Sequence, residues 1–101
     1  MNDSFFPSGP TTNAVFTTTG TVKATVGGAG DALRIVNTGT TTAFLTLENT
    51  GTITAATATS MPIVNGHAPE IFAINPTGTI YATGIVASGS TTVYFTRGDK
   101  A

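Results

Sequence analysis

The chain has 101 residues, a net charge of −1 and no cysteine, which predicts one compact domain and excludes disulfide frameworks, thiolate nucleophiles and the usual zinc ligand sets. Charged residues make up only 9% of the sequence, against about 25% in an average soluble domain. Its four Lys and Arg residues are scattered, so we expect no nucleic-acid partner. Stretches rich in apolar residues, such as 33–36 and 85–87, are far shorter than a membrane span, so we expect no membrane partner.

Threonine replaces charge as the main polar residue. The sequence holds 23 threonines, 12 glycines and 5 serines, and 40% of its residues are hydrophobic. Disordered chains lack apolar and β-branched residues, whereas threonine is β-branched and favours strands. The composition therefore predicts pleated sheets with a polar surface.

The first 13 residues differ in kind from the rest. Phe5 and Phe6 are followed by Pro7, Gly9 and Pro10, with no alternation of apolar and polar residues. Because proline disfavours regular pairing, we predict an extended N-terminal arm over residues 1–13, followed by a single β-sandwich domain over 14–101. Two adjacent phenylalanines cannot both face one core from a strand. We expect an arm docked on a neighbouring chain, with a frayed terminus as the alternative.

Alternating apolar and polar residues predict eight short antiparallel strands after the arm. They lie near residues 14–18, 21–26, 31–37, 42–48, 57–60, 70–75, 79–84 and 91–96. Three turns with Asn and Gly, at 37–40, 49–52 and 75–79, suit tight reversals. The predicted fold class is all-β, an eight-stranded antiparallel sandwich or jelly roll with an extended N-terminal arm, and an open barrel is the alternative. The Thr/Ala run at 52–60 suits a surface loop as readily as a strand.

Residues with catalytic chemistry are sparse. His67 is the one histidine, and its place between Asn-Gly and Ala-Pro predicts a solvated turn residue. The carboxylates Asp31, Glu48, Glu70 and Asp99 are single and widely spaced, with no pattern of a calcium loop or an acid/base pair. We therefore expect no enzymatic activity, no cofactor and no metal.

Three short motifs have structural explanations. The glycine-rich run 27–30 lacks the Lys-Ser/Thr pair of a phosphate loop and suits a flexible loop. Arg97-Gly98-Asp99 matches a tripeptide of adhesion ligands, but its place after the last predicted strand suits a terminal turn. The Thr-Gly-Thr triplets are irregularly spaced, which argues against the regular solenoid of an ice-binding ladder.

Several aromatic residues fall on polar registers of the predicted strands. Phe44, Tyr81 and Tyr94 lie among threonines, and lysine, which often protects sheet edges, is nearly absent. This pattern suggests faces covered by other subunits. Phe44 has an alternative place in the core through a bulge, so Tyr81 and Tyr94 are the stronger candidates. We expect a homo-oligomer, most simply a cyclic one.

The pattern of strands and turns over about residues 31–98 resembles the small capsid decoration, or cement, proteins of tailed bacteriophages. The residues that carry this resemblance are 31–40 (DALRIVNTGT), 43–45 (AFL), 61–63 (MPI) with Gly66, 70–72 (EIF), 81–82 (YA) and 93–98 (VYFTRG). Members of the family usually end in a glycine-rich segment, whereas this chain ends in Arg97-Gly98-Asp99-Lys100-Ala101.

The resemblance implies a jelly-roll virion protein, often trimeric, that lies on the outside of an icosahedral head and holds adjacent major capsid subunits together. The implied partners are the major capsid protein and two further copies of the chain, and the implied location is the capsid surface after synthesis in the host cytoplasm. We expect Phe5, Phe6, Tyr81 and Tyr94 to make the capsid or subunit contacts. The alternatives are a tail, neck or head-fibre component, a glycan-binding β-sandwich module, or a bacterial surface module.

Overall fold

The computed structural model describes residues 5–7, 11–19, 22–48, 57, 60–66, 70–74 and 79–100. These described residues form nine β-strands and no helix. The strands are β1 (Phe5–Pro7), β2 (Thr12–Phe16), β3 (Lys23–Val26), β4 (Ala32–Asn37), β5 (Ala43–Glu48), β6 (Met61–Ile63), β7 (Glu70–Ala73), β8 (Ile80–Ile85) and β9 (Thr91–Lys100).

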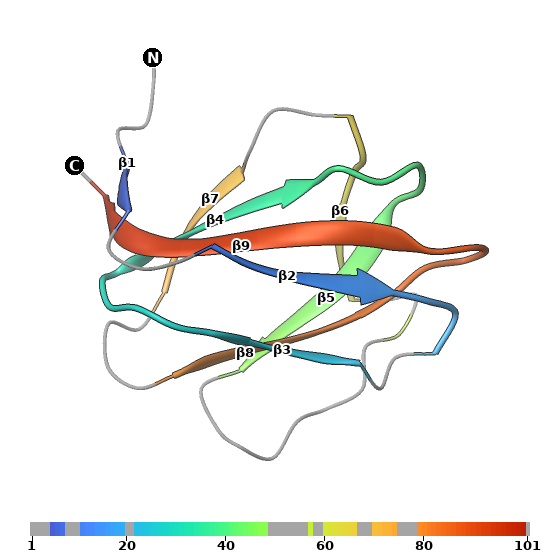
Figure 1. Cartoon of the computed structure of the whole chain (residues 1–101), viewed down its shortest axis with the longest axis horizontal. Helices are drawn as coiled ribbons and strands as arrows, with labels where there is room; N and C mark the ends of the chain where they lie inside the picture. Colours follow the sequence, from blue (N-terminus) through green and yellow to red (C-terminus); the bar gives the residue numbers. More distant parts are fainter. Residues whose placement is uncertain are drawn as a thin grey trace.

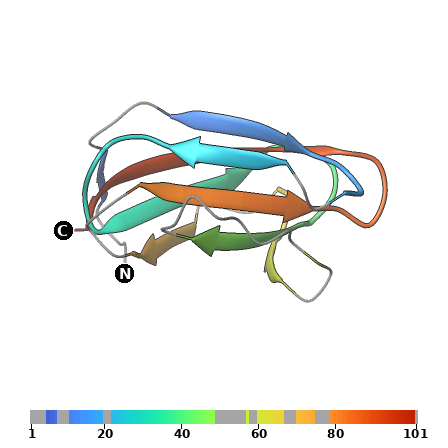
Figure 2. The ribbon, with the colours of Figure 1, turned by 90° about the horizontal axis from the view of Figure 1, so that it is seen from below.

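The strands form two antiparallel sheets that pack face to face, which confirms the predicted all-β sandwich. In sheet A the order is β1-β9-β4-β7, and β2 also pairs with β9. Because β1 pairs with the last three residues of β9 and β2 with its first five, they lie one after the other along the same edge. Sheet B has the order β3-β8-β5-β6. Figure 1 shows β9, in red, along the length of the molecule, and Figure 2 shows β3, β8 and β5 side by side.

The chain changes sheet at almost every connection between β2 and β9. Only β5 and β6 follow each other within one sheet. The pairs nest instead: β2 pairs with β9, β3 with β8, β4 with β7, and β5 with β6. Each pair joins strands from the two halves of the chain, so both halves are needed to close the sandwich.

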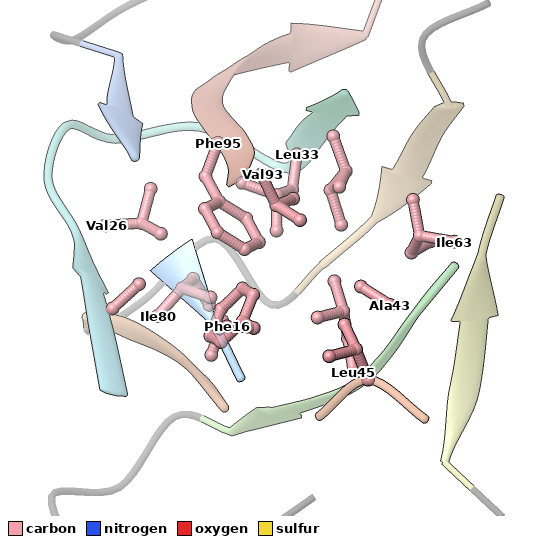
Figure 3. Close-up of a cluster of buried hydrophobic side chains, with 13 residues drawn as sticks. Phe16, Val26, Leu33, Ala43, Leu45, Ile63, Ile80, Val93 and Phe95 are labelled. Atoms are coloured by element: carbon pink, nitrogen blue, oxygen red, sulfur yellow. The ribbon is translucent and has the colours of Figure 1, made fainter. Parts of the chain in front are cut away.

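Side chains from both sheets meet in one apolar core (Figure 3). Phe16 and Phe95 are fully buried and contact each other edge to face, with ring centroids 6.3 Å apart. Gly84 of the opposite sheet makes room for this pair, because a Cβ at Gly84 would lie 2.6 Å from Phe16 Cγ and 2.8 Å from Leu45 Cδ2. Burial of each large side chain contributes about 1.5–3 kcal/mol, so this interlocking is a main source of stability.

A buried asparagine fastens one end of the sandwich. Asn37 is 3% exposed, and its Nδ2 donates to the carbonyl oxygens of Thr41 and Ile63, both at 2.9 Å. Its Oδ1 accepts from the Gly39 N–H at 3.1 Å and from the Thr91 hydroxyl at 2.6 Å. One side chain therefore links the end of β4, the following loop, β6 and the start of β9.

The segment 37–40 does not form the predicted tight reversal between paired strands. It carries the chain from β4 in sheet A to β5 in sheet B. Gly39 is required there because of a close approach, since a Cβ on it would collide with the Thr91 side chain. The predicted turns at 49–52 and, apart from residue 79, at 75–79 lie outside the described residues.

Three strand predictions need correction. The first sandwich strand spans 12–16, not 14–18, and the last continues to residue 100 instead of ending at 96. The strand predicted at 57–60 is wrong, because residues 57 and 60 are not in a strand and β6 lies at Met61–Ile63. Pro62 is tolerated within β6 because β6 is an edge strand.

The region predicted as an arm without regular pairing contains β1. Phe5, Phe6 and Pro7 pair with Lys100, Asp99 and Gly98 of the same chain. Proline is compatible with this position because β1 lies at the edge of sheet A. Residues 1–4 and 8–10 lie outside the described part of the chain.

We predict that Asn37→Ala lowers the free energy of unfolding by about 2–4 kcal/mol, since buried groups that lose a hydrogen-bond partner cost about 1–3 kcal/mol each and these costs are not additive. Chemical denaturation followed by circular dichroism measures the change. Thr40→Ala, at an exposed position in the same loop, is the control and should change stability by less than about 0.5 kcal/mol. Equal stability of the two variants would contradict the fastening role of Asn37.

Candidate contact surfaces

The structure places the four predicted contact residues in three different regions. Tyr94 lies in β9 on the outward face of sheet A, because its neighbours Val93 and Phe95 are buried on the opposite side. Tyr81 lies in β8 on the outward face of sheet B, between the buried Ile80 and Ala82, so the two tyrosines are on opposite faces of the sandwich. Phe5 and Phe6 belong to β1 at the edge of sheet A.

The outward face of sheet A, here called the A face, is an apolar and hydroxyl-bearing surface. Tyr94 is 36% exposed, and its Cα partners on the two neighbouring strands are Asn13 and Val36. Val15 is 50% exposed and lies on the same face, two residues along β2 from Asn13. The described side chains of the A face are Asn13, Val15, Arg34, Val36, Ile71, Thr92, Tyr94 and Thr96.

Charge is scarce on this surface. Arg34 is the single charged side chain among the described members of the A face, and it is half-buried between Thr96 and Ile71, its Cα partners. Protein interfaces are depleted of charge in their cores and enriched in tyrosine. Removing the A face from water by contact with another protein would thus desolvate few charged groups.

The outward face of sheet B, here called the B face, carries charge beside its tyrosine. Lys23 places its Nζ 5.1 Å from the centroid of the Tyr81 ring, a cation–π contact. Glu48 is the Cα partner of Tyr81 on the other neighbouring strand. Lys23 covers one side of the Tyr81 ring, and Tyr81 is itself half-buried. The B face therefore offers less free aromatic surface than the A face.

Phe44 also points outward on the B face. It lies between Ala43 and Leu45, which are buried in the core, and it is itself half-buried. Its Cα partners are Pro62 and Ile85. The alternative that Phe44 enters the core through a bulge is therefore wrong, and its place on a polar register is confirmed.

Sequence reasoning missed Val15, Val36 and Ile71 as members of the A face. Val15 precedes the buried Phe16, and Val36 follows the buried Ile35, so each stands on the register that should be polar. An apolar residue directly beside a core position in a strand is the signal that would have found them.

The Arg97-Gly98-Asp99 tripeptide lies within β9 and not in the predicted terminal turn. Arg97 is 1% exposed, and its Nε donates to the carbonyl oxygen of Gly30 at 3.1 Å. Arg97 follows Phe95 on the inward register of sheet A, so it closes one end of the core. Its guanidinium is committed to the fold and is not presented to a receptor.

The described residues include no group of three or more His, Cys, Asp or Glu side chains that could hold a metal ion. His67 lies outside the part of the chain that the structure describes. No helix in the described part is long and apolar enough to span a membrane. Comparison with protein-family models, curated proteins and solved structures finds no match for this chain.

We predict that the purified protein does not support adhesion of integrin-bearing cells, because recognition of the tripeptide needs an accessible guanidinium and Arg97 is buried. Cell attachment to surfaces coated with the folded protein measures this. A short peptide that spans residues 95–100 is the matched control, since its arginine is free of the fold. Attachment to the folded protein as strong as to the peptide would contradict the burial argument.

Proposed function

We propose that this chain is a structural virion protein that binds the outer surface of an icosahedral phage head and stabilises contacts between major capsid subunits. It has no enzymatic role in this proposal. The chain would be made in the host cytoplasm and act on the virion, as a homotrimer. The observation that carries the proposal is the A face, a sheet surface with an exposed tyrosine, an exposed valine and a single described charge.

We also propose that β2 to β9 form a jelly roll. The proposal is supported by the nested pairing of β2 with β9, β3 with β8, β4 with β7 and β5 with β6. Such pairing is expected when one long antiparallel hairpin is rolled into two facing sheets of four strands. Jelly rolls occur in viral capsid proteins, lectins and cupins, so the fold is compatible with the virion role without proving it.

The proposed mechanism is mechanical. A packaged genome pushes capsid subunits apart, and a small protein that binds across a subunit boundary adds contact area that must be broken before the subunits separate. Stable attachment needs about 800 Å² of buried surface on each partner, which is within the scale of one face of this sandwich. Three linked copies bind more tightly than one, because the second and third contacts form at high effective concentration.

The residues proposed for these contacts are Tyr94 on the A face, Tyr81 on the B face, and Phe5 and Phe6 in β1. Because the two tyrosines lie on opposite faces, one partner surface cannot cover both. The A face is the better capsid contact, since its tyrosine carries no cation–π partner in the described structure. The B face and β1 remain for contacts with other copies.

We predict that Tyr94→Lys and Val15→Lys each weaken binding to capsid shells at least about tenfold. An interface tyrosine typically contributes more than about 1–2 kcal/mol, and a lysine adds a charge that the contact must desolvate. Co-sedimentation with shells of the major capsid protein from the same genome measures the affinity.

Ser88→Lys places the same charge at an exposed position in the loop between β8 and β9, which belongs to neither face, and is the matched control. All three variants should unfold at nearly the same denaturant concentration as the parent protein. Equal loss of binding in Ser88→Lys, or none in the two A-face variants, would refute the A face as the capsid contact. Failure of the parent chain to bind shells, together with specific binding to a glycan array, would favour the glycan-binding alternative.

We predict that capsid binding persists at about 1 M salt. The Debye length is then about 3 Å, so attraction between exposed charges is screened, whereas burial of apolar surface is not weakened. The measurement is the fraction of protein that remains on purified particles after a high-salt wash. Release of most copies by salt would show that ion pairs, and not the apolar A face, hold the protein to the shell.

A further inference from the structure

The strand β1 is, with β6, one of the two shortest strands of the described fold, and it lies at a sheet edge. It consists of three residues, and β9 is its one strand partner. Pro7 has no N–H, so β1 has at most two backbone donors. Short edge segments with few backbone hydrogen bonds open at a small free-energy cost compared with global unfolding.

The part of β9 that holds β1 extends past the last residue that pairs with β4, and the loop at Gly30 lies beside Gly98 and Asp99. On its other side β9 pairs with β4, and this pairing ends at Gly98 opposite Ala32. Asp99 and Lys100 therefore have β1 as their single strand partner within the described residues. This end of the sheet is a two-stranded ribbon, and such ribbons are marginally stable in water.

We infer that β1 is an exchangeable strand: in the assembled form, Phe5–Pro7 of one copy pairs with residues 98–100 of β9 in a second copy. Each copy carries both a β1 strand and the end of β9 that pairs with it. Exchange therefore replaces every contact between β1 and β9 with an identical contact between two copies. A β9 end left without β1 is an open edge that recruits a strand. We assign the open edge to the β1 of a second copy, because each residue of that strand has a defined partner on β9.

The connection between β1 and β2 limits how the copies can be arranged. Pro7 and Thr12 pair with Gly98 and Phe95, which are three residues apart on β9 and so roughly 10 Å apart. Five Cα–Cα steps between Pro7 and Thr12 can span at most about 17–18 Å. An exchanging neighbour must therefore bring the end of its β9 close to Thr12, which requires the two copies to pack closely together.

The inference rests on the self-association that the proposed function includes, and it names the strand that joins the copies. The test uses engineered cysteines, because the natural sequence has none. Phe6→Cys is made in one chain and Asp99→Cys in a second chain that carries a size tag, because these residues are Cα partners. The two chains are unfolded together, refolded and oxidised.

Exchange predicts a disulfide-linked dimer that contains one chain of each kind, visible on a non-reducing gel and identified by mass spectrometry. The matched control places Val15→Cys in one chain and Thr92→Cys in the other. These residues are also Cα partners, but in the β2–β9 pair, which stays within one chain. The control mixture should give no mixed dimer above the level of random collision.

Each other outcome is decisive. If light scattering shows an oligomer but the Phe6→Cys and Asp99→Cys chains form no mixed dimer, the exchange is overturned and self-association stands. If the control pair forms as much mixed dimer as the test pair, the linkage is random and the exchange is also overturned. A protein that is monomeric at micromolar concentration overturns both, whereas capsid binding is measured separately and is not decided by this experiment.

Discussion

The strand β9 is the constraint on which the rest of the structure depends. It runs through sheet A, pairs with β1 and β2 on one edge and with β4 on the other, and alternates between buried and outward-facing residues from Thr91 to Phe95. Phe95 on its inner side contacts Phe16, while Tyr94 on its outer side forms the centre of the A face. A shift of its register by one residue would exchange these two roles, because side chains in a strand alternate with a period of two.

The two outward faces of the sandwich differ in chemistry although both are rich in threonine. The A face has a tyrosine beside valines and one described charge, whereas the B face has a tyrosine beside a lysine and a glutamate. Threonine keeps both faces hydrated without fixed charge and retains the branched shape that strands favour. A surface of this kind loses little electrostatic solvation when another protein covers it, which is the physical basis of the structural role proposed for the chain.

Attachment is uneven along the sandwich. At one end, Asn37 is hydrogen-bonded to four groups from three parts of the chain, and every buried side-chain nitrogen or oxygen of the described residues has a partner. At the other end, β1 is held by three residue pairs at the end of β9. The hydrogen bonds of Asn37 hold one end of the sandwich together, whereas one short ladder holds β1 at the other. A fold with this division is suited to exchange strands between copies and keep its surfaces unchanged.

The sequence alone determined the all-β class and most strand positions, because core residues such as Val93 and Phe95 recur at every second position, as strand geometry requires. It left an open barrel as the alternative to the sandwich. It also placed Tyr81 and Tyr94 outside the core, and it left Phe44 open between the core and the surface. Only the tertiary structure decided which outward residues share a face, since Tyr94, Val36 and Val15 come from three strands that nested pairing brings together. Likewise, the segment 37–40 crosses between the sheets because Asn37 finds its partners in β6 and β9, far away in the sequence. Alternation is a local property that each strand carries by itself, whereas pairing and burial depend on contacts between distant residues, and no local pattern records them.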